Sequence, residues 1–125
     1  MEPAETVGAF IRALEKKEIG AALGLLAEEV VYHNIPLDPV VGRRAVGEFL
    51  EAFLGPAQEV EWVVHHQATL GGVVLNERTD RFLLAGRWVE IPVAGVWEVS
   101  GGRISHWRDY FDLQMVTAAM APPAD

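Results

Sequence analysis

The chain contains no cysteine among its 125 residues, so disulfide bonds, thiolate catalysis and cysteine-based metal sites are excluded. Basic residues are also scarce. The sequence has 10 lysines and arginines against 18 aspartates and glutamates, which gives a formal net charge of −8. This excess of negative charge argues against nucleic acid or an anionic membrane surface as a partner.

Long apolar runs are missing too, and no stretch approaches the length that a membrane span needs. Residues 1–5 are acidic and lead into an amphipathic segment, unlike the basic start and apolar run of a signal peptide. We therefore expect a soluble cytoplasmic protein. Because 50% of the residues are hydrophobic, the chain can bury a core, and we expect one globular domain over residues 1–125.

Apolar residues in the first half recur at the i, i+3, i+4, i+7 spacing of helices with one buried face. Three such stripes are present: Val7, Phe10, Ile11 and Leu14; Ile19, Ala22, Leu23 and Leu26; Val46, Phe49, Leu50 and Phe53. The third helix is predicted to end at Gly55–Pro56. Residues 30–35 are predicted to form a short strand that closes at Pro36.

From residue 57 onward the apolar period becomes two, with glycine-containing turns between the segments. Strands are predicted at 58–70, 73–84, 87–99 and 103–111, followed by a helical segment at 113–120 and a tail at Pro122–Pro123. The short strand can add at an edge of this meander. The expected architecture is an α+β roll, in which a curved, mixed but mainly antiparallel sheet wraps around N-terminal helices.

A bent sheet that wraps around helices encloses a blind pocket, and apolar pockets of this kind take small molecules. The outer face of the sheet is not wholly polar, because Trp88 and Val96 point away from the face that carries Ile91 and Val93. An apolar patch on that face predicts a partner subunit, and we expect a homodimer.

Charged residues stand among apolar ones on two of the predicted strands. Strand alternation puts Arg78 and Asp80 on the same face as Phe82, and it puts Asp109 between Trp107 and Phe111. For Arg78 and Asp80, a surface ion pair remains as good an interpretation as a buried one. An acid between two aromatic rings is costly unless its charge is paired or its proton retained, so Asp109 is predicted to be buried with Arg78 as its partner.

Tyr32 and Asn34 share one face of the short strand. The simpler interpretation, in which Asn34 caps the turn before Pro36 and Tyr32 is a half-buried aromatic residue, is the one that these residues alone favour. The alternative is that the hydroxyl and the amide together hold one ordered water.

The four histidines do not form a metal motif. His65 and His66 are adjacent on a strand and should point to opposite faces, while His33 and His106 lie far from both in the sequence. A glycine-rich phosphate loop and a Gly-x-Ser-x-Gly nucleophile turn are also missing from the sequence. We therefore expect neither a metal nor a nucleotide cofactor.

Several segments together resemble the limonene-1,2-epoxide hydrolase family, within the superfamily of nuclear-transport-factor-2-like (NTF2-like) or SnoaL-like domains. They are Tyr32 to Leu37, Gly42–Arg43 at the start of a helix, Glu77 to Asp80, and Trp107 to Leu113. The resemblance runs through nearly the whole chain in the same order of elements. This chain differs in being shorter at the N-terminus and between the strands after Phe82.

The resemblance implies a role for each matching residue. Asp109, with Tyr32 and Asn34, would hold and deprotonate a water. Asp80 would be the protonated acid that donates to the epoxide oxygen, and Arg78 would orient both carboxyl groups. Independently, two carboxyl groups with one cation in an apolar pocket should retain one proton at neutral pH.

The predicted function is a cofactor-independent epoxide hydrolase that adds water to a small hydrophobic epoxide and gives a vicinal diol. The residues expected to form the apolar walls are Phe82, Ile91, Val93, Trp107 and Phe111. One alternative is a ketosteroid-isomerase-like or polyketide-cyclase-like enzyme, which has no need for an arginine shared by two aspartates. A second alternative is a non-catalytic domain that binds a small apolar molecule.

Overall fold

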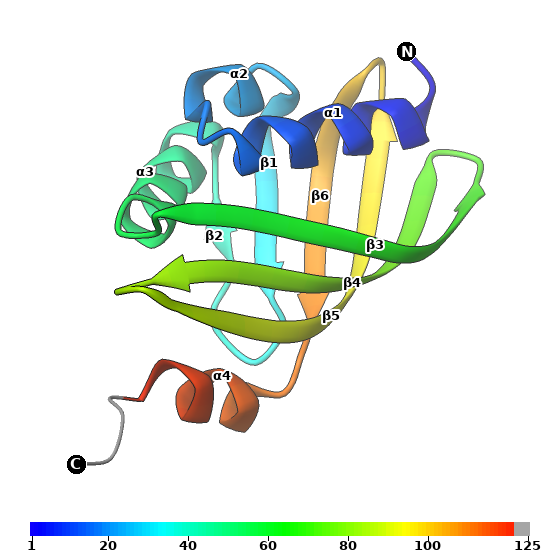
Figure 1. Cartoon of the computed structure of the whole chain (residues 1–125). Helices are drawn as coiled ribbons and strands as arrows, with labels where there is room; N and C mark the ends of the chain where they lie inside the picture. The colour runs from blue at the N-terminus through cyan, green and yellow to red at the C-terminus, as the bar shows by residue number, and fades with distance from the viewer. Residues whose placement is uncertain (122–125) are drawn as a thin grey trace.

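The computed structural model describes residues 1–121, so the tail expected at Pro122–Pro123 lies outside the described residues. The helices are α1 (Pro3–Glu15), α2 (Ile19–Leu23), α3 (Arg43–Leu54) and α4 (Leu113–Met120). The strands are β1 (Leu26–Asn34), β2 (Val40–Val41), β3 (Glu59–Leu70), β4 (Val73–Leu84), β5 (Arg87–Ser100) and β6 (Arg103–Tyr110). Helices and strands thus follow one another in the predicted order (Figure 1).

The strands form one sheet in the order β2-β1-β6-β5-β4-β3. Consecutive strands from β3 to β6 pair antiparallel, whereas β1 runs parallel to β6 and carries β2 on its other side. The turn between β5 and β6 has two glycines, Gly101 and Gly102, with φ of 59° and 76°. Tight hairpin turns with two positive φ angles favour glycine, so this turn suits its sequence. The predicted mixed, mainly antiparallel sheet is confirmed.

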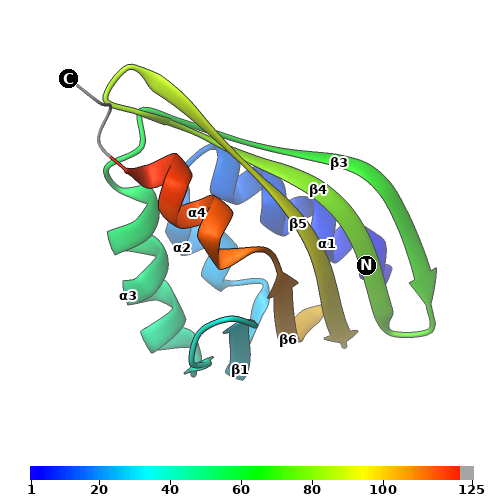
Figure 2. The same ribbon diagram turned by 90° about the horizontal axis from the view of Figure 1, so that it is seen from below.

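The sheet bends so strongly that β3 and β4 run nearly across β1 and β6 (Figure 1). Seen from below, the long strands β3, β4 and β5 curve together past α1, with α3 and α4 near their ends (Figure 2). The core lies between the helices and the inner face of this bend. Phe10 of α1 packs edge-on against the indoles of Trp97 and Trp107, at ring-centroid distances of 5.7 and 5.1 Å. Such edge-to-face pairs are favourable arrangements of aromatic rings.

Helix α1 begins at Pro3 behind a capping box, in which the side chain of Glu5 accepts from the backbone N–H of Glu2. Its stripe of Val7, Phe10 and Leu14 is fully buried, as the spacing predicts. At the far end of the chain, Val116 and Ala119 of α4 pack against apolar residues of β5. The sheet is thus covered by helices at both ends of its inner face.

Two local predictions are wrong. Leu26 was expected in the second helix, but it is the first residue of β1. The backbone N–H of Ile104 donates to the carbonyl of Leu25, so pairing with β6 takes over where the short helix ends at Gly24. The two-residue strand β2 was not predicted, because Val40–Val41 is too short to show a period. Within residues 1–121, every helix lacks the length and apolar character needed to cross a bilayer.

Candidate active site

Strand register brings three distant segments to one place on the inner face of the sheet. On β4, Arg78 and Asp80 alternate with outward residues and are almost fully buried, which rules out the surface ion pair. Because β1 runs parallel to β6, Asn34 lies beside Asp109, and Tyr32 lies beside Trp107. The expected catalytic residues therefore share one face and converge, although they lie up to 77 positions apart, from 32 to 109.

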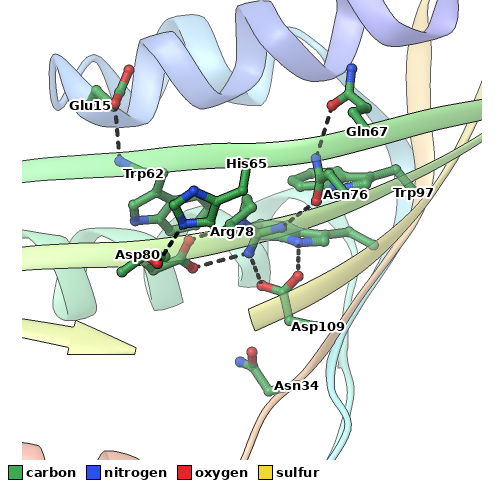
Figure 3. Close-up of polar contacts among 12 residues, drawn as sticks. Glu15, Asn34, Trp62, His65, Gln67, Asn76, Arg78, Asp80, Trp97 and Asp109 are labelled. Atoms are coloured by element: carbon green, nitrogen blue, oxygen red, sulfur yellow. Dashed lines mark hydrogen bonds and ion pairs between the residues drawn. The ribbon is translucent and has the colours of Figure 1, made fainter. Parts of the chain in front are cut away.

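The guanidinium of Arg78 lies between the two carboxyl groups (Figure 3). Its Nε donates to Asp80 Oδ1 at 2.9 Å, and its Nη2 donates to Asp80 Oδ2 and to Asp109 Oδ2, both at 3.0 Å. The rings of Trp62 and Trp97 flank it, with centroids 4.9 and 5.5 Å from the guanidinium carbon. Charged, hydrogen-bonded and stacked contacts therefore hold this cation on several sides.

The second oxygen of Asp109 has a partner of its own. Asp109 Oδ1 accepts from the indole N–H of Trp107 at 2.9 Å. The Trp107 ring is stacked between those of Tyr32 and Trp97, at centroid distances of 3.8 and 4.8 Å. This stack crosses β1, β6 and β5 and fixes the indole that orients the carboxyl group.

Tyr32 and Asn34 are joined directly, since the Tyr32 hydroxyl donates to Asn34 Oδ1 at 3.1 Å. The carbonyl of Asn34 accepts from the backbone N–H of Leu37 at 2.7 Å, so Asn34 closes the turn through its backbone. Its side chain is left to line the cavity beside Asp109. The turn is therefore closed by the backbone of Asn34 rather than by its side chain, and the hydroxyl of Tyr32 and the amide of Asn34 lie together.

Burial sets the protonation of the groups in this site. It raises the pKa of Asp80 from 3.8 to about 6, against the opposing effect of Arg78. Burial also raises the pKa of Asp109, again against Arg78 and the Trp107 indole. The pKa of Tyr32 is raised by burial and by the charge of Asp109, so its hydroxyl keeps its proton.

Arg78 stays charged, because the two carboxylates outweigh the effect of its burial and raise its pKa. If both carboxyl groups were ionised, the cluster of Arg78, Asp80 and Asp109 would carry a net charge of −1. One retained proton brings that charge to zero, which is the state that apolar surroundings favour. The cluster thus offers one carboxylate that can accept a proton and one carboxyl group that can donate one.

Next to this cluster lies a cavity of about 130 Å³. Its polar lining consists of Tyr32, Asn34, Asp80 and Asp109, and the other lining residues are apolar. The apolar lining comprises Leu37, Phe49, Leu50, Phe53, Trp62, Phe82, Leu84, Val89, Ile91, Val93, Phe111, Leu113, Val116 and Met120. An apolar cavity with few polar groups at one point is the usual form of a small-molecule site.

Of the five predicted wall residues, Phe82, Ile91, Val93 and Phe111 line the cavity. Trp107 does not, because α1 and the aromatic stack cover it completely. It supports Asp109 from behind instead.

Sequence reasoning missed Asn76, which is buried on the same face of β4 and accepts a hydrogen bond from Arg78 Nη1. The same alternation that pointed to Arg78 and Asp80 could have identified it. The prediction that His65 and His66 point to opposite faces is wrong. A register shift between Val64 and His66 turns both toward outer-face residues, Thr79 for His65 and Glu77 for His66.

Comparison with known proteins gives consistent matches. A family model described as the limonene-1,2-epoxide hydrolase catalytic domain matches residues 1–121. The epoxide hydrolase EphG of Mycobacterium tuberculosis is 35% identical over 107 residues, which cover 86% of this chain and 71% of that protein. The solved structure of an M. tuberculosis LEH-like epoxide hydrolase superposes with a TM-score of 0.84 at 31% identity, over 94% of this chain and 88% of that one.

More distant structures share the fold alone. A protein with a ketosteroid isomerase-like fold from Catenulispora acidiphila has a TM-score of 0.82 at 21% identity, over 98% of this chain and all of that one (100%). An NTF2-like protein from Burkholderia pseudomallei has a TM-score of 0.81 at 20% identity, over 95% and 98% of the two chains. The predicted α+β NTF2-like fold is confirmed.

The raised pKa of Asp80 predicts how stability depends on pH. The folded state binds this proton more tightly than the unfolded state, so the stabilisation is fully present below about pH 4 and is lost as pH rises through about 6. The rise of the Asp80 pKa from 3.8 to about 6 corresponds to about 3 kcal/mol in the free energy of unfolding. We expect Asp80→Asn to remove this part of the pH dependence. Urea unfolding of both proteins between about pH 4 and about pH 8 measures it, and parallel stability curves would contradict the assignment.

Proposed function

Because the chain belongs to the limonene-1,2-epoxide hydrolase family and is an epoxide hydrolase of that family, we propose that it hydrates a small hydrophobic epoxide in one step. The product is a vicinal diol. The observation that carries the proposal is the guanidinium of Arg78 shared by two buried carboxyl groups beside an apolar cavity. The family and the relative named as an epoxide hydrolase support the reaction class.

In this proposal Asp109 is the general base. A water held by Tyr32 and Asn34 gives a proton to Asp109 as its oxygen bonds to an epoxide carbon. The epoxide C–O bond breaks in the same step, and Asp80 donates its proton to the departing oxygen. The two carboxyl groups have then exchanged protonation states, and one proton returned from Asp109 to Asp80 restores the resting site.

The same geometry explains why one acid and one base of the same residue type can serve. Asp109 lies beside Asn34, where the water would be held, and Asp80 lies on β4 on the other side of Arg78. Arg78 contacts both, so its charge supports the carboxylate at each stage of the proton exchange. A guanidinium bound to both acids supports the hydrolase over an isomerase-like enzyme, which needs a single base and an oxyanion hole.

The substrate follows from the lining of the cavity. Away from the cluster the walls are aliphatic and aromatic. They include Phe82, Ile91, Val93 and Phe111. An epoxide that is otherwise a hydrocarbon matches these walls, whereas a charged substituent would be desolvated without a partner.

We also propose that a second copy of the chain covers the outer face of the sheet. Leu75, Trp88 and Tyr110 are 46%, 37% and 45% exposed there, on the side away from the helices. Leu75 pairs with Val96 across β4 and β5, and Tyr110 pairs with Ala94 across β5 and β6, so these residues form an apolar strip. Trp88 lies farther along β5, beside Leu83. A twofold contact uses one patch twice, and an apolar strip can match itself without complementary charges.

The two-carboxylate mechanism predicts that Asp109→Asn and Asp80→Asn each lower kcat by about a hundredfold or more, because each removes one of the two proton transfers. Diol formation from limonene oxide, cyclohexene oxide and styrene oxide measures the effect, and circular dichroism checks the fold. Asp112→Asn is the matched control, since Asp112 caps α4 and lies off the cavity lining. Full turnover by either active-site variant would refute the mechanism.

Direct hydration predicts the source of the new oxygen. In ¹⁸O-labelled water, with enzyme in excess over epoxide, the diol should carry the label after the first turnover, because no ester to the protein forms. Mass spectrometry of the diol measures this. Unlabelled diol in that first turnover would instead show that a carboxylate oxygen of the protein had been transferred.

The dimer proposal predicts that sedimentation equilibrium gives twice the mass of one chain. Leu75→Arg should convert the protein to a monomer, because it places a charge within the apolar strip. Val41→Arg on β2, at the opposite edge of the sheet and 62% exposed, should leave the dimer intact. A wild-type protein that sediments as a monomer at all concentrations would contradict the proposal.

A further inference from the structure

The side chain of Arg78 has to cross a whole strand to do its work. It starts on β4 and ends at Asp109 on β6, and β5 lies between them. Adjacent strands lie about 4.8 Å apart, so the side chains of Arg78 and Asp109 together bridge about 10 Å, and the guanidinium lies over the backbone of β5. The β5 residue at that point is Gly95, which pairs with Asp109 on one side and with Asn76 on the other.

Gly95 leaves the space that the guanidinium occupies. A Cβ added there would lie 2.4 Å from Arg78 Nη1, 2.8 Å from Asn76 Oδ1 and 2.9 Å from Trp97 Nε1. The end of an arginine usually moves aside at low cost. Here its Nε and Nη2 are fixed by Asp80 and Asp109, so any movement breaks the contacts that orient the carboxyl groups.

Asn76 holds the remaining nitrogen. Its Oδ1 accepts from Arg78 Nη1 at 3.0 Å and from the indole N–H of Trp97 at 3.2 Å, and its Nδ2 donates to Gln67 Oε1 at 3.2 Å. Because the amide nitrogen is bound to Gln67, the oxygen is the atom turned toward the guanidinium (Figure 3). The residue is buried, so water does not compete for these bonds.

The neutrality of this acceptor matters as much as its position. An aspartate at position 76 could accept the same two hydrogen bonds, but it would add a third carboxylate to a single guanidinium. The positive charge of Arg78 would then be divided among three acids, and Asp80 and Asp109 would hold their protons more tightly. A neutral amide leaves the whole charge to the two acids.

We propose that Asn76 and Gly95 are positioning residues that together set the place and the undivided charge of the Arg78 guanidinium. Gly95 provides the passage across β5, and Asn76 fixes the end of the guanidinium with an uncharged oxygen. Their roles in turnover rest on the proposed function, in which Arg78 serves both the acid and the base.

Asn76→Asp tests the charge. It should fold and keep KM within about twofold, because the apolar walls are unchanged. The whole pH profile of kcat should move by about one unit to higher pH, because the base and the acid both lose protons later. A purely structural role for Asn76 would not move the profile. Wild-type kcat with an unmoved profile would overturn the proposal.

Gly95→Ala tests the passage, with Gly20→Ala as the matched control because a Cβ at Gly20 has no atom within 4 Å. The control should keep wild-type kcat. Gly95→Ala should lower kcat by about a hundredfold with KM little changed, because the displaced guanidinium no longer orients the two carboxyl groups. A folded Gly95→Ala protein with wild-type kcat would overturn the assignment of Gly95.

A variant can lose activity because it fails to fold, so a further variant and a measurement without substrate are needed. If Asn76→Asp and Gly95→Ala are both unfolded by circular dichroism, the smaller and uncharged Asn76→Ala decides. It should lower kcat by about tenfold with KM unchanged, because only the guanidinium loses its acceptor, whereas a loosened structure would raise KM as well. Wild-type kcat in this variant would overturn the assignment of Asn76. A wild-type protein inert toward the epoxides would sink the proposed function alone. The ¹³C titration of the carboxyl groups of Asp80 and Asp109 then decides without a substrate. It should shift upward in Asn76→Asp, and superimposable titrations would refute the inference.

Discussion

A guanidinium with no exposed side-chain surface is the constraint on which the rest of the site depends. Taking a charge out of water costs several kcal/mol, so Arg78 can lie in the core only if partners surround it. Two aspartates, one amide oxygen and two indole faces supply them. Each of these partners depends in turn on its contact with Arg78. The carboxyl groups can approach each other only because the cation lies between them, and one of them retains a proton because there is one cation for two acids.

The bent sheet meets these requirements through register. The parallel pairing of β1 with β6 places Asn34 beside Asp109, and the antiparallel pairs continue that row through Gly95 to Asn76. The neighbouring row contains the stacked rings of Tyr32, Trp107 and Trp97. A slip of one residue in any of these strands would turn its polar group outward. The same slip would turn the aromatic ring of that strand outward, so packing of the rings also fixes the register of the polar row. The polar residues of the site and the aromatic residues that pack beside them therefore form adjacent rows of the same sheet.

Much of this arrangement could be predicted, because a strand alternates with a period of two whatever surrounds it. Alternation put Arg78 and Asp80 on the face of Phe82 but left their burial open, and it predicted that Asp109 is buried. The helical stripes placed α1 and α3. Alternation within one strand does not show which other element packs against a residue. Trp107 shares a face with Asp109, but Phe10 of α1 covers it, and helix docking is not visible in a strand pattern. The extra residue near His65 and the early start of β1 at Leu26 were missed for a similar reason, since pairing with another strand decides both.

The same apolar walls serve binding and proton transfer. Burial raises the pKa of Asp80 to about 6, so a carboxyl group that would be ionised in water can keep a proton near neutral pH. In the proposed reaction, a hydrocarbon substrate that fills the cavity would displace water from the other side of the cluster and strengthen this effect. Desolvation would also make the paired carboxylate a stronger base toward the water that the proposed mechanism places beside it. Under this proposal an apolar substrate would help to prepare the acid and the base that act on it, whereas a small polar molecule that admits water would weaken both.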